Sequence, residues 1–147
     1  MALVLNEEQV MLKDAAAGFL AEKATVAHLR ALRDEASEQG YDENVWREMA
    51  EMGWAGIAIP EEFGGLGYGY TGLGLVLEQA GRNLSASPLQ STVLVGATLV
   101  LELGNREQKE RLLPAIAAGE KIVTLALQEG PHHAPEQVAA TAASETA

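Results

Sequence analysis

The glycine-rich loop around residues 64–69 is the first of three groups of residues whose types and spacing could do chemistry. Gly65, Gly67 and Gly69 alternate with other residues, and glycine-rich backbone of this kind can hold a phosphate. A phosphate loop is preceded by a strand and often contains a lysine, whereas here Glu61 and Glu62 precede the glycines and no lysine is near. The spacing also differs from the dinucleotide-binding fingerprint. We therefore interpret the loop as a tight connection between two helices.

Histidines form the second group. His132 and His133 are adjacent, with Glu129 and Glu136 nearby, but no third ligand stands at a spacing typical of metal sites. We expect a solvated pair and no metal site. His28 lies in a polar helical segment and is interpreted as a surface residue.

Carboxylates form the third group. General acid–base catalysis needs a carboxyl group whose surroundings shift its pKa, and the adjacent pairs Glu7–Glu8 and Glu61–Glu62 give no sign of such surroundings. Glu102 is the one charge on an otherwise apolar helix, and near the end of that helix it can reach solvent. The absence of cysteine excludes a thiol nucleophile. Residue types alone therefore predict no catalytic constellation.

The composition narrows the class of protein. The chain has 147 residues, of which 48% are apolar, enough for the core of one domain. Lys and Arg number 10 against 21 Asp and Glu, and the resulting charge of −11 disfavours nucleic-acid binding. The longest apolar run, 89–103, is too short to span a bilayer, and Met1 to Asn6 lacks a secretory pattern. We expect a cytoplasmic protein without membrane insertion.

Helix start signals and apolar spacing predict a mostly helical chain. The start signals are Asn6 with Gln9, Asp42, Ser87 with Pro88, and Asn105 with Gln108. The expected helices cover about 7–23, 26–34, 43–52, 71–83, 88–103 and 106–118. The helix over 88–103 is apolar on nearly all sides, so it should be buried. The predicted fold class is all-α, a bundle of about five or six helices around this buried apolar helix.

Two short apolar stretches are expected to be extended. Trp54 to Ile59 ends at Pro60, and Ile122 to Leu127 has the β-branched, apolar composition of a buried strand. A single strand at the end of a helical bundle has no partner. The sequence therefore predicts that this chain is the front part of something longer.

Three runs of residues carry a resemblance to a known family. They are WAGIAIPEEFGGLG over 54–67, EQAGR over 78–82 and LGNREQKERLLPAIAAGE over 103–120. In order and spacing, from about Leu5 to Glu129, the chain resembles the amino-terminal helical domain of acyl-CoA dehydrogenases. The resemblance implies a helical domain over 1–121 and the truncated start of a middle β-domain over 122–147.

The resemblance also implies an activity. Family members contain a second helical bundle after the β-domain and bind FAD. They remove the α-proton of an acyl-CoA with a glutamate and transfer the β-hydride to the flavin. Electrons then pass to an electron-transferring flavoprotein, and the assembly is a homo- or heterotetramer of sister subunits. The catalytic glutamate lies in the second bundle, so this chain is expected to contain no catalytic residue and to be inactive alone.

The resemblance places two groups of site residues. Leu125, Leu127 and Gln128 are expected beside the flavin, in the segment where the family has Thr-Glu-Pro and then Gly-Ser-Asp. Here Gln128 replaces the threonine, Gly130 replaces the proline, and Ala134 and Pro135 stand where serine and aspartate are expected. Lost hydroxyls remove hydrogen-bond donors to flavin and CoA.

The second group lies near the start of the 88–103 helix, which helps to line the acyl cavity in the family. Ser91, Thr92 and Val95 are the expected lining residues, and core packing is the competing interpretation.

Three functions remain open at this stage. The leading one is an FAD-dependent acyl-CoA dehydrogenase acting in fatty acid or sterol catabolism. The second function, a non-catalytic partner subunit of a heteromeric dehydrogenase, is favoured by the loss of the Thr-Glu-Pro pattern. The third is a related flavin oxidase or monooxygenase.

Overall fold

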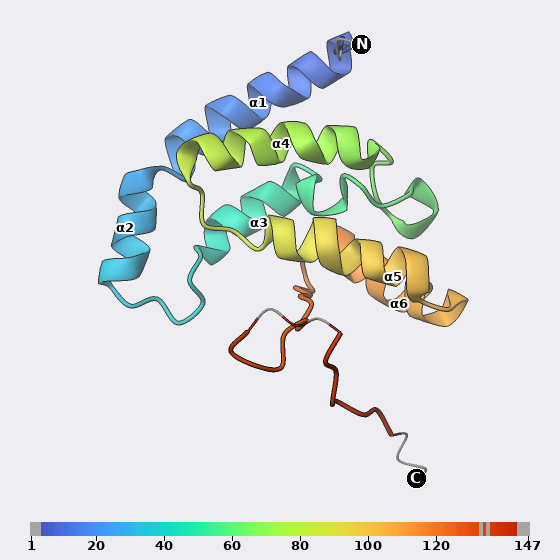
Figure 1. Cartoon of the computed structure of the whole chain (residues 1–147). Coiled ribbons are helices and arrows are strands. Elements are labelled where there is room, and N and C mark those ends of the chain that lie inside the picture. Colours follow the sequence, from blue (N-terminus) through green and yellow to red (C-terminus); the bar gives the residue numbers. More distant parts are fainter. Residues whose placement is uncertain (1–3, 133, 135, 144–147) are drawn as a thin grey trace.

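The computed structural model describes residues 4–132, 134 and 136–143, and within these residues the chain is helical and forms no strand (Figure 1). The elements in chain order are α1 (Glu7–Lys23), α2 (Val26–Asp34), α3 (Glu43–Glu51), the 3₁₀ turns η1 (Trp54–Gly56) and η2 (Glu61–Phe63), α4 (Gly69–Asn83), the π-helix η3 (Gln90–Ala97), α5 (Thr98–Leu103) and α6 (Arg106–Ala117). The all-α bundle predicted from the sequence is confirmed.

The helices stack in layers. In Figure 1, α1 lies along α4 on one side of the bundle, α3 lies in the middle, and η3, α5 and α6 lie on the other side. An apolar core joins these layers, with fully buried side chains from α1, α3, α4, η3 and the turn after η1. They include Leu20, Met49, Ile57, Val76 and Val93. Burial of this apolar surface is the main stabilising contribution to the bundle.

Local signals set the ends of the helices as the sequence predicted. The Asn6 side chain accepts a hydrogen bond from the N–H of Gln9 (2.8 Å), and Gln9 accepts one from the N–H of Asn6 (3.1 Å). Asn105 and Gln108 make the same reciprocal pair at the start of α6. Both capping boxes are therefore confirmed, and they fix where the helical backbone begins.

The predicted 88–103 helix forms as one rod made of two kinds of helix. Its first part is the π-helix η3, and helical backbone already begins at Leu89, with the N–H of Thr92 donating to the carbonyl of Pro88 (2.9 Å). No side chain caps this start, so the prediction of Ser87 as the cap is wrong. The π-helix runs directly into α5. Burial follows the same division, because Val93 and Ala97 are buried in η3, whereas Leu103 at the end of α5 is 79% exposed.

The first predicted extended stretch, Trp54–Ile59, is wrong. Gly53 adopts a left-handed conformation (φ 79°) that ends α3, and the chain then turns through η1. Trp54 is buried there, with its ring packed edge-on against Phe19 at 5.4 Å between centroids. A turn buries these apolar side chains without the neighbouring strand that an extended conformation would need.

The predicted C-terminal strand over Ile122–Leu127 is also wrong for this chain. The segment is neither helix nor strand in the described structure. The physical reason is the lack of a partner strand among the described residues, since a strand exists only as part of a hydrogen-bonded ladder. The backbone of Val123 is instead hydrogen-bonded to the side chain of Thr92.

Candidate functional site

The glycine-rich loop is closed on itself. The N–H groups of residues 64–68 all donate to backbone carbonyls of residues 56–61, with donor–acceptor distances from 2.9 to 3.2 Å. Gly65 packs so closely that an added Cβ would overlap the carbonyl oxygen of Ile59 and lie 2.6 Å from that of Gly56. Because these N–H groups are already bonded, the loop cannot offer them to a phosphate. The interpretation as a tight connection is confirmed.

The histidines behave differently from one another. His132 is exposed, and His133 lies outside the described residues, as does Pro135. No group of three His, Asp or Glu side chains that could hold a metal ion occurs within residues 4–132, 134 and 136–143. His28 is half-buried, and its Nε2 lies 3.2 Å from Oδ2 of Asp42, so it is part of a contact between helices.

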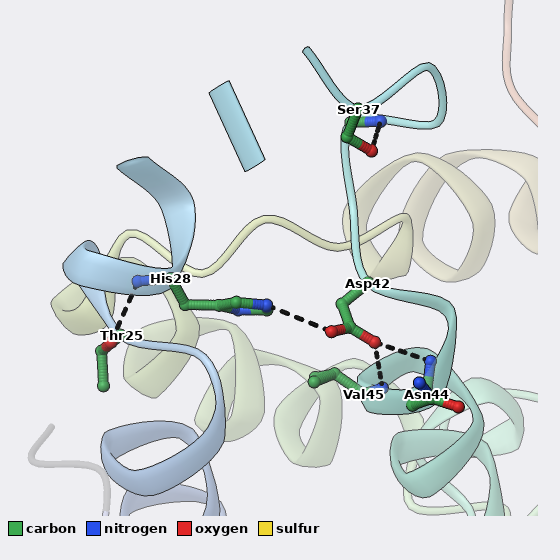
Figure 2. A network of polar contacts seen from close by, with 7 residues as sticks. Thr25, His28, Ser37, Asp42, Asn44 and Val45 are labelled. Carbon is green, nitrogen blue, oxygen red and sulfur yellow. Dashed lines mark hydrogen bonds and ion pairs between the residues drawn. The ribbon is translucent and has the colours of Figure 1, made fainter. Parts of the chain in front are cut away.

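Figure 2 shows this contact, with His28 extending from α2 toward Asp42 at the start of α3. The other oxygen of Asp42 accepts hydrogen bonds from the N–H groups of Asn44 (2.8 Å) and Val45 (3.1 Å). The hydrogen bond from Val45 is the largest cause that lowers the pKa of Asp42, and Asn44 and His28 lower it further. Since every partner here is a helix terminus or a neighbouring helix, the network is structural.

The carboxylates singled out in the sequence are exposed. Glu7 and Glu8 lie in the first turn of α1, Glu61 and Glu62 on the turn before the glycine loop, and Glu102 on α5. Glu62 pairs with Arg106 at 3.3 Å on the surface. Exposed carboxylates are solvated and lack the desolvation that prepares a general acid or base.

The three predicted acyl-lining residues lie on η3 but differ in their surroundings. Ser91 and Val95 are half-buried, and the Ser91 hydroxyl donates to the carbonyl of Pro88 (3.1 Å). Thr92 is fully buried, and its hydroxyl donates to the carbonyl of Val123 (3.1 Å) and accepts from the N–H of Val123 (3.2 Å). Thr92 therefore contacts the segment that carries the predicted flavin residues.

The predicted flavin residues extend from this contact along the surface. Leu125 and Leu127 are 44% and 47% exposed, and Gln128 is also exposed. Leu125 closes one side of an open groove of about 380 Å³. The other groove residues come from α5, the turn after it and α6, and are Leu99, Val100, Leu103, Gly104, Gln108 and Leu112.

Sequence reasoning missed both this groove and the close approach of Gly96 to Val123. A Cβ on Gly96 would lie 2.9 Å from the Cβ of Val123. Two signals were available. One was a glycine in the middle of an apolar helix, which often marks a close approach, and the other was the excess of leucine toward the end of that helix.

Comparison with known proteins decides the family. Residues 6–120 match the family described as "Acyl-CoA dehydrogenase, N-terminal domain". The chain belongs to the acyl-CoA dehydrogenase family. It is 38% identical over 122 residues to "Acyl-CoA dehydrogenase IpdE2" of Mycolicibacterium smegmatis, a match that covers 82% of this chain and 37% of that protein. The chain thus spans little more than a third of the length of this curated acyl-CoA dehydrogenase.

Solved acyl-CoA dehydrogenase structures agree in fold. A variant of the Tcur3481-Tcur3483 steroid ACAD is 41% identical with a TM-score of 0.75, covering 84% of this chain and 33% of that one. The ChsE4-ChsE5 complex from Mycobacterium tuberculosis is 26% identical with a TM-score of 0.79, covering 91% of this chain and 36% of that one. In addition, no helix among the described residues has the length and apolarity needed to cross a membrane.

Proposed function

We propose that this chain is the amino-terminal part of an FAD-dependent acyl-CoA dehydrogenase, which desaturates the α,β-bond of an acyl-CoA thioester. The observation that carries the proposal is the family match over residues 6–120. The exposure of Leu125 and Leu127, which follow the Val123 that Thr92 binds, supports it. The catalytic base belongs to sequence outside this chain, so the chain alone is inactive.

We also propose a domain division in which residues 1–121 belong to the helical domain and residues 122–147 begin a middle β-domain. The end of the family match at residue 120 supports it. In the whole protein the Ile122–Leu127 segment gains a partner strand and becomes the strand that its composition predicts.

FAD fits this chain in part. Two exposed leucine side chains suit an aromatic ring face, but the charged side chains within residues 4–132, 134 and 136–143 all lie at least partly in solvent. The described residues therefore offer no buried cation to a pyrophosphate. When bound, FAD accepts the hydride that leaves the β-carbon of the substrate. This chain contributes Leu125, Leu127 and Gln128 beside the ring.

The substrate is an acyl-CoA whose chain lies against η3, with Ser91 and Val95 on the cavity wall. Similarity to a protein described as a steroid ACAD supports a sterol-derived or fatty acyl group. Sister subunits complete the tetramer, and an electron-transferring flavoprotein takes up the electrons. We place the protein in the cytoplasm.

A second candidate is a non-catalytic partner subunit of a heteromeric dehydrogenase. Gln128 and Gly130 stand where the family has threonine and proline, which removes a hydroxyl donor beside the flavin. The similar ChsE4-ChsE5 structure is itself a complex of two proteins.

The visible spectrum of the whole protein that contains this chain distinguishes the two candidates. We expect bound flavin, bleached under anaerobic conditions by a steroid-derived or fatty acyl-CoA. Flavin that no acyl-CoA reduces would contradict the dehydrogenase. A flavin-free subunit that copurifies with a flavin-bearing sister would support the partner instead. The matched control is this chain alone, which should bind no flavin.

A further inference from the structure

Thr92 makes an unusual use of its hydroxyl group. The hydroxyl bonds both the carbonyl and the N–H of one residue, Val123, at 3.1 and 3.2 Å, and the side chain is fully buried. In a β-ladder the backbone of a partner strand satisfies a residue in this way. Here a side chain of the π-helix takes the place of that partner.

Gly96, four residues further along the same rod, brings Val123 still closer. A Cβ on Gly96 would lie 2.9 Å from the Cβ and 3.0 Å from the carbonyl oxygen of Val123. Neither atom is the free end of a flexible side chain, so any larger residue at position 96 must push the segment away. Val123 also packs against the buried cluster that contains Ala97 and Leu113.

The helix that carries these residues is itself irregular. Segments of π-helix are rare and occur frequently at functional sites. The irregular region, Gln90–Ala97, contains Thr92 and Gly96, and the rod returns to α-helix at Thr98. The departure from α-helical geometry thus coincides with the two residues that contact Val123.

The segment beyond Val123 depends on this contact. The backbone N–H of Lys121, two residues before Val123, donates to the carbonyl of Ala115 (3.1 Å), and the Thr92 hydroxyl then binds Val123. Leu125 and Leu127 follow with nearly half of each side chain exposed. The position of Val123 therefore determines where the backbone that leads to these two leucines leaves the bundle.

We propose that Thr92 and Gly96 form a clamp on Val123 that positions the flavin-contacting segment, so that Thr92 is a positioning residue and its hydroxyl does not face the acyl chain. The inference rests on the proposed function. Displacement of a flavin neighbour by about 1 Å can slow a reaction about a hundredfold, because hydride transfer needs close alignment of donor and acceptor. The clamp fixes the backbone at Val123, from which the chain leads to Leu125 and Leu127.

The test compares four variants of the whole protein. Thr92→Val has nearly the same shape and loses both hydrogen bonds, Thr92→Ser keeps the hydroxyl, and Gly96→Ala leaves Thr92 intact but displaces Val123. Thr98→Val is the matched control, because the Thr98 hydroxyl, on the same rod, donates to the carbonyl of Leu94 (2.6 Å) and pairs with the hydroxyl of Tyr70 (2.9 Å) rather than with Val123. The readouts are amide hydrogen exchange at Val123, the flavin absorption spectrum, and kcat and KM with an acyl-CoA.

We expect Thr92→Val to speed exchange at Val123 about tenfold, through loss of the hydrogen bond to its N–H. The flavin bands should shift and kcat should fall about tenfold or more, with KM nearly unchanged. Gly96→Ala should shift the bands in the same way. Thr92→Ser and Thr98→Val should resemble the wild type.

Three results would overturn the proposal. Unchanged exchange at Val123 in Thr92→Val would contradict the clamp itself. Faster exchange with unchanged flavin bands and kcat would contradict its role in positioning. A raised KM with unchanged kcat in Thr92→Val would indicate that Thr92 lines the acyl cavity instead. A whole protein without flavin contradicts the proposed function, and the exchange measurement still reports separately on the clamp.

Discussion

Two stretches of the chain lie beside the helices without α-helical backbone. One is residues 56–68, called the loop below, which includes η2 and most of the glycine-rich residues, and the other is the segment 121–128. They are stabilised differently. In the loop, the N–H groups of residues 64–68 are bonded to carbonyls within the loop, and Ile57, Ile59 and Phe63 are buried. In the segment, Val123 is bonded to a side chain of η3, while Leu125 and Leu127 remain exposed.

The difference shows that irregular backbone can be as fixed as a helix when its polar groups are paired and its apolar groups are buried. The loop pairs its N–H groups with its own carbonyls, and its Ile57, Ile59 and Phe63 side chains are buried against the neighbouring helices. The 121–128 segment has the apolar side chains of a buried strand but few neighbours to cover them. That is the condition expected of a segment completed by other parts of a larger protein, as the proposed domain division requires.

The largest effect should come from Gly65→Ala, which tests how tightly the loop is closed. Its Cβ would overlap the Ile59 carbonyl and approach that of Gly56, and backbone atoms cannot move aside cheaply. We expect a loss of about 4 kcal/mol in the free energy of unfolding, measured by chemical denaturation. Gly74→Ala, on an open face of α4, is the control and should stabilise the chain by up to about 1 kcal/mol. Equal effects of the two changes would contradict the close packing of the loop.

A paired truncation compares the two regions directly. Ile59→Ala removes a fully buried side chain and should cost about 3 kcal/mol. Leu127→Ala removes a half-exposed one and should change the stability of this chain by less than about 0.5 kcal/mol. Urea denaturation of both variants provides the measurement. A large loss in Leu127→Ala would mean that the segment is already packed in the isolated chain.

The end of α6 offers a third test. Its Ala117 packs against Gly56 of the loop, and the 121–128 segment follows it in the chain. Gly119 has φ 75°, an added Cβ would overlap that of Ala50, and its carbonyl accepts a hydrogen bond from Nε1 of Trp46 (2.9 Å). Gly119→Ala should cost about 2 kcal/mol through left-handed strain and displacement of α3. Trp46→Phe removes the hydrogen bond and also truncates a buried ring, so it should cost about 2 kcal/mol as well. Thermal unfolding that shows no loss of stability in either variant would contradict this packing.

The comparison also explains what the sequence could predict. Capping residues act over three or four positions, so Asn6, Asp42 and Asn105 marked their helices correctly. The turn at Trp54 and the π-helix at 90–97 depend on contacts between distant residues, which local patterns do not contain. Residues 122–127 have a composition that favours a strand, but a strand forms only when a second strand pairs with it, and the composition does not say whether one is present. Thr92 was predicted to line the acyl cavity or to pack in the core, and its hydrogen bonds to Val123 could not be predicted from spacing.

Removal of the polar contact at Asp42 should cost less stability than the changes in buried packing described above. Hydrogen bonds from Val45 and Asn44 and the neighbouring His28 lower the pKa of Asp42 below its ordinary value of 3.8. The cap therefore stabilises the fold above that pH, and its contribution is lost as the pH falls through the lowered pKa. Asp42→Ala should cost about 1 kcal/mol at neutral pH. Asp42→Asn keeps a cap acceptor, so its stability should depend less on pH in the acid range, and an unchanged dependence would contradict this role.

Hydrogen exchange along the isolated chain tests the contrast between the two regions most directly. The amides of residues 64–68 should exchange far more slowly than those of an unfolded peptide, because each donates a hydrogen bond to a carbonyl of residues 56–61. Val123 should be protected by Thr92, while residues 124–127 should exchange at nearly the rate of an unfolded peptide. Protection of 124–127 equal to that of the loop would show that the segment is complete within this chain, and would contradict the account.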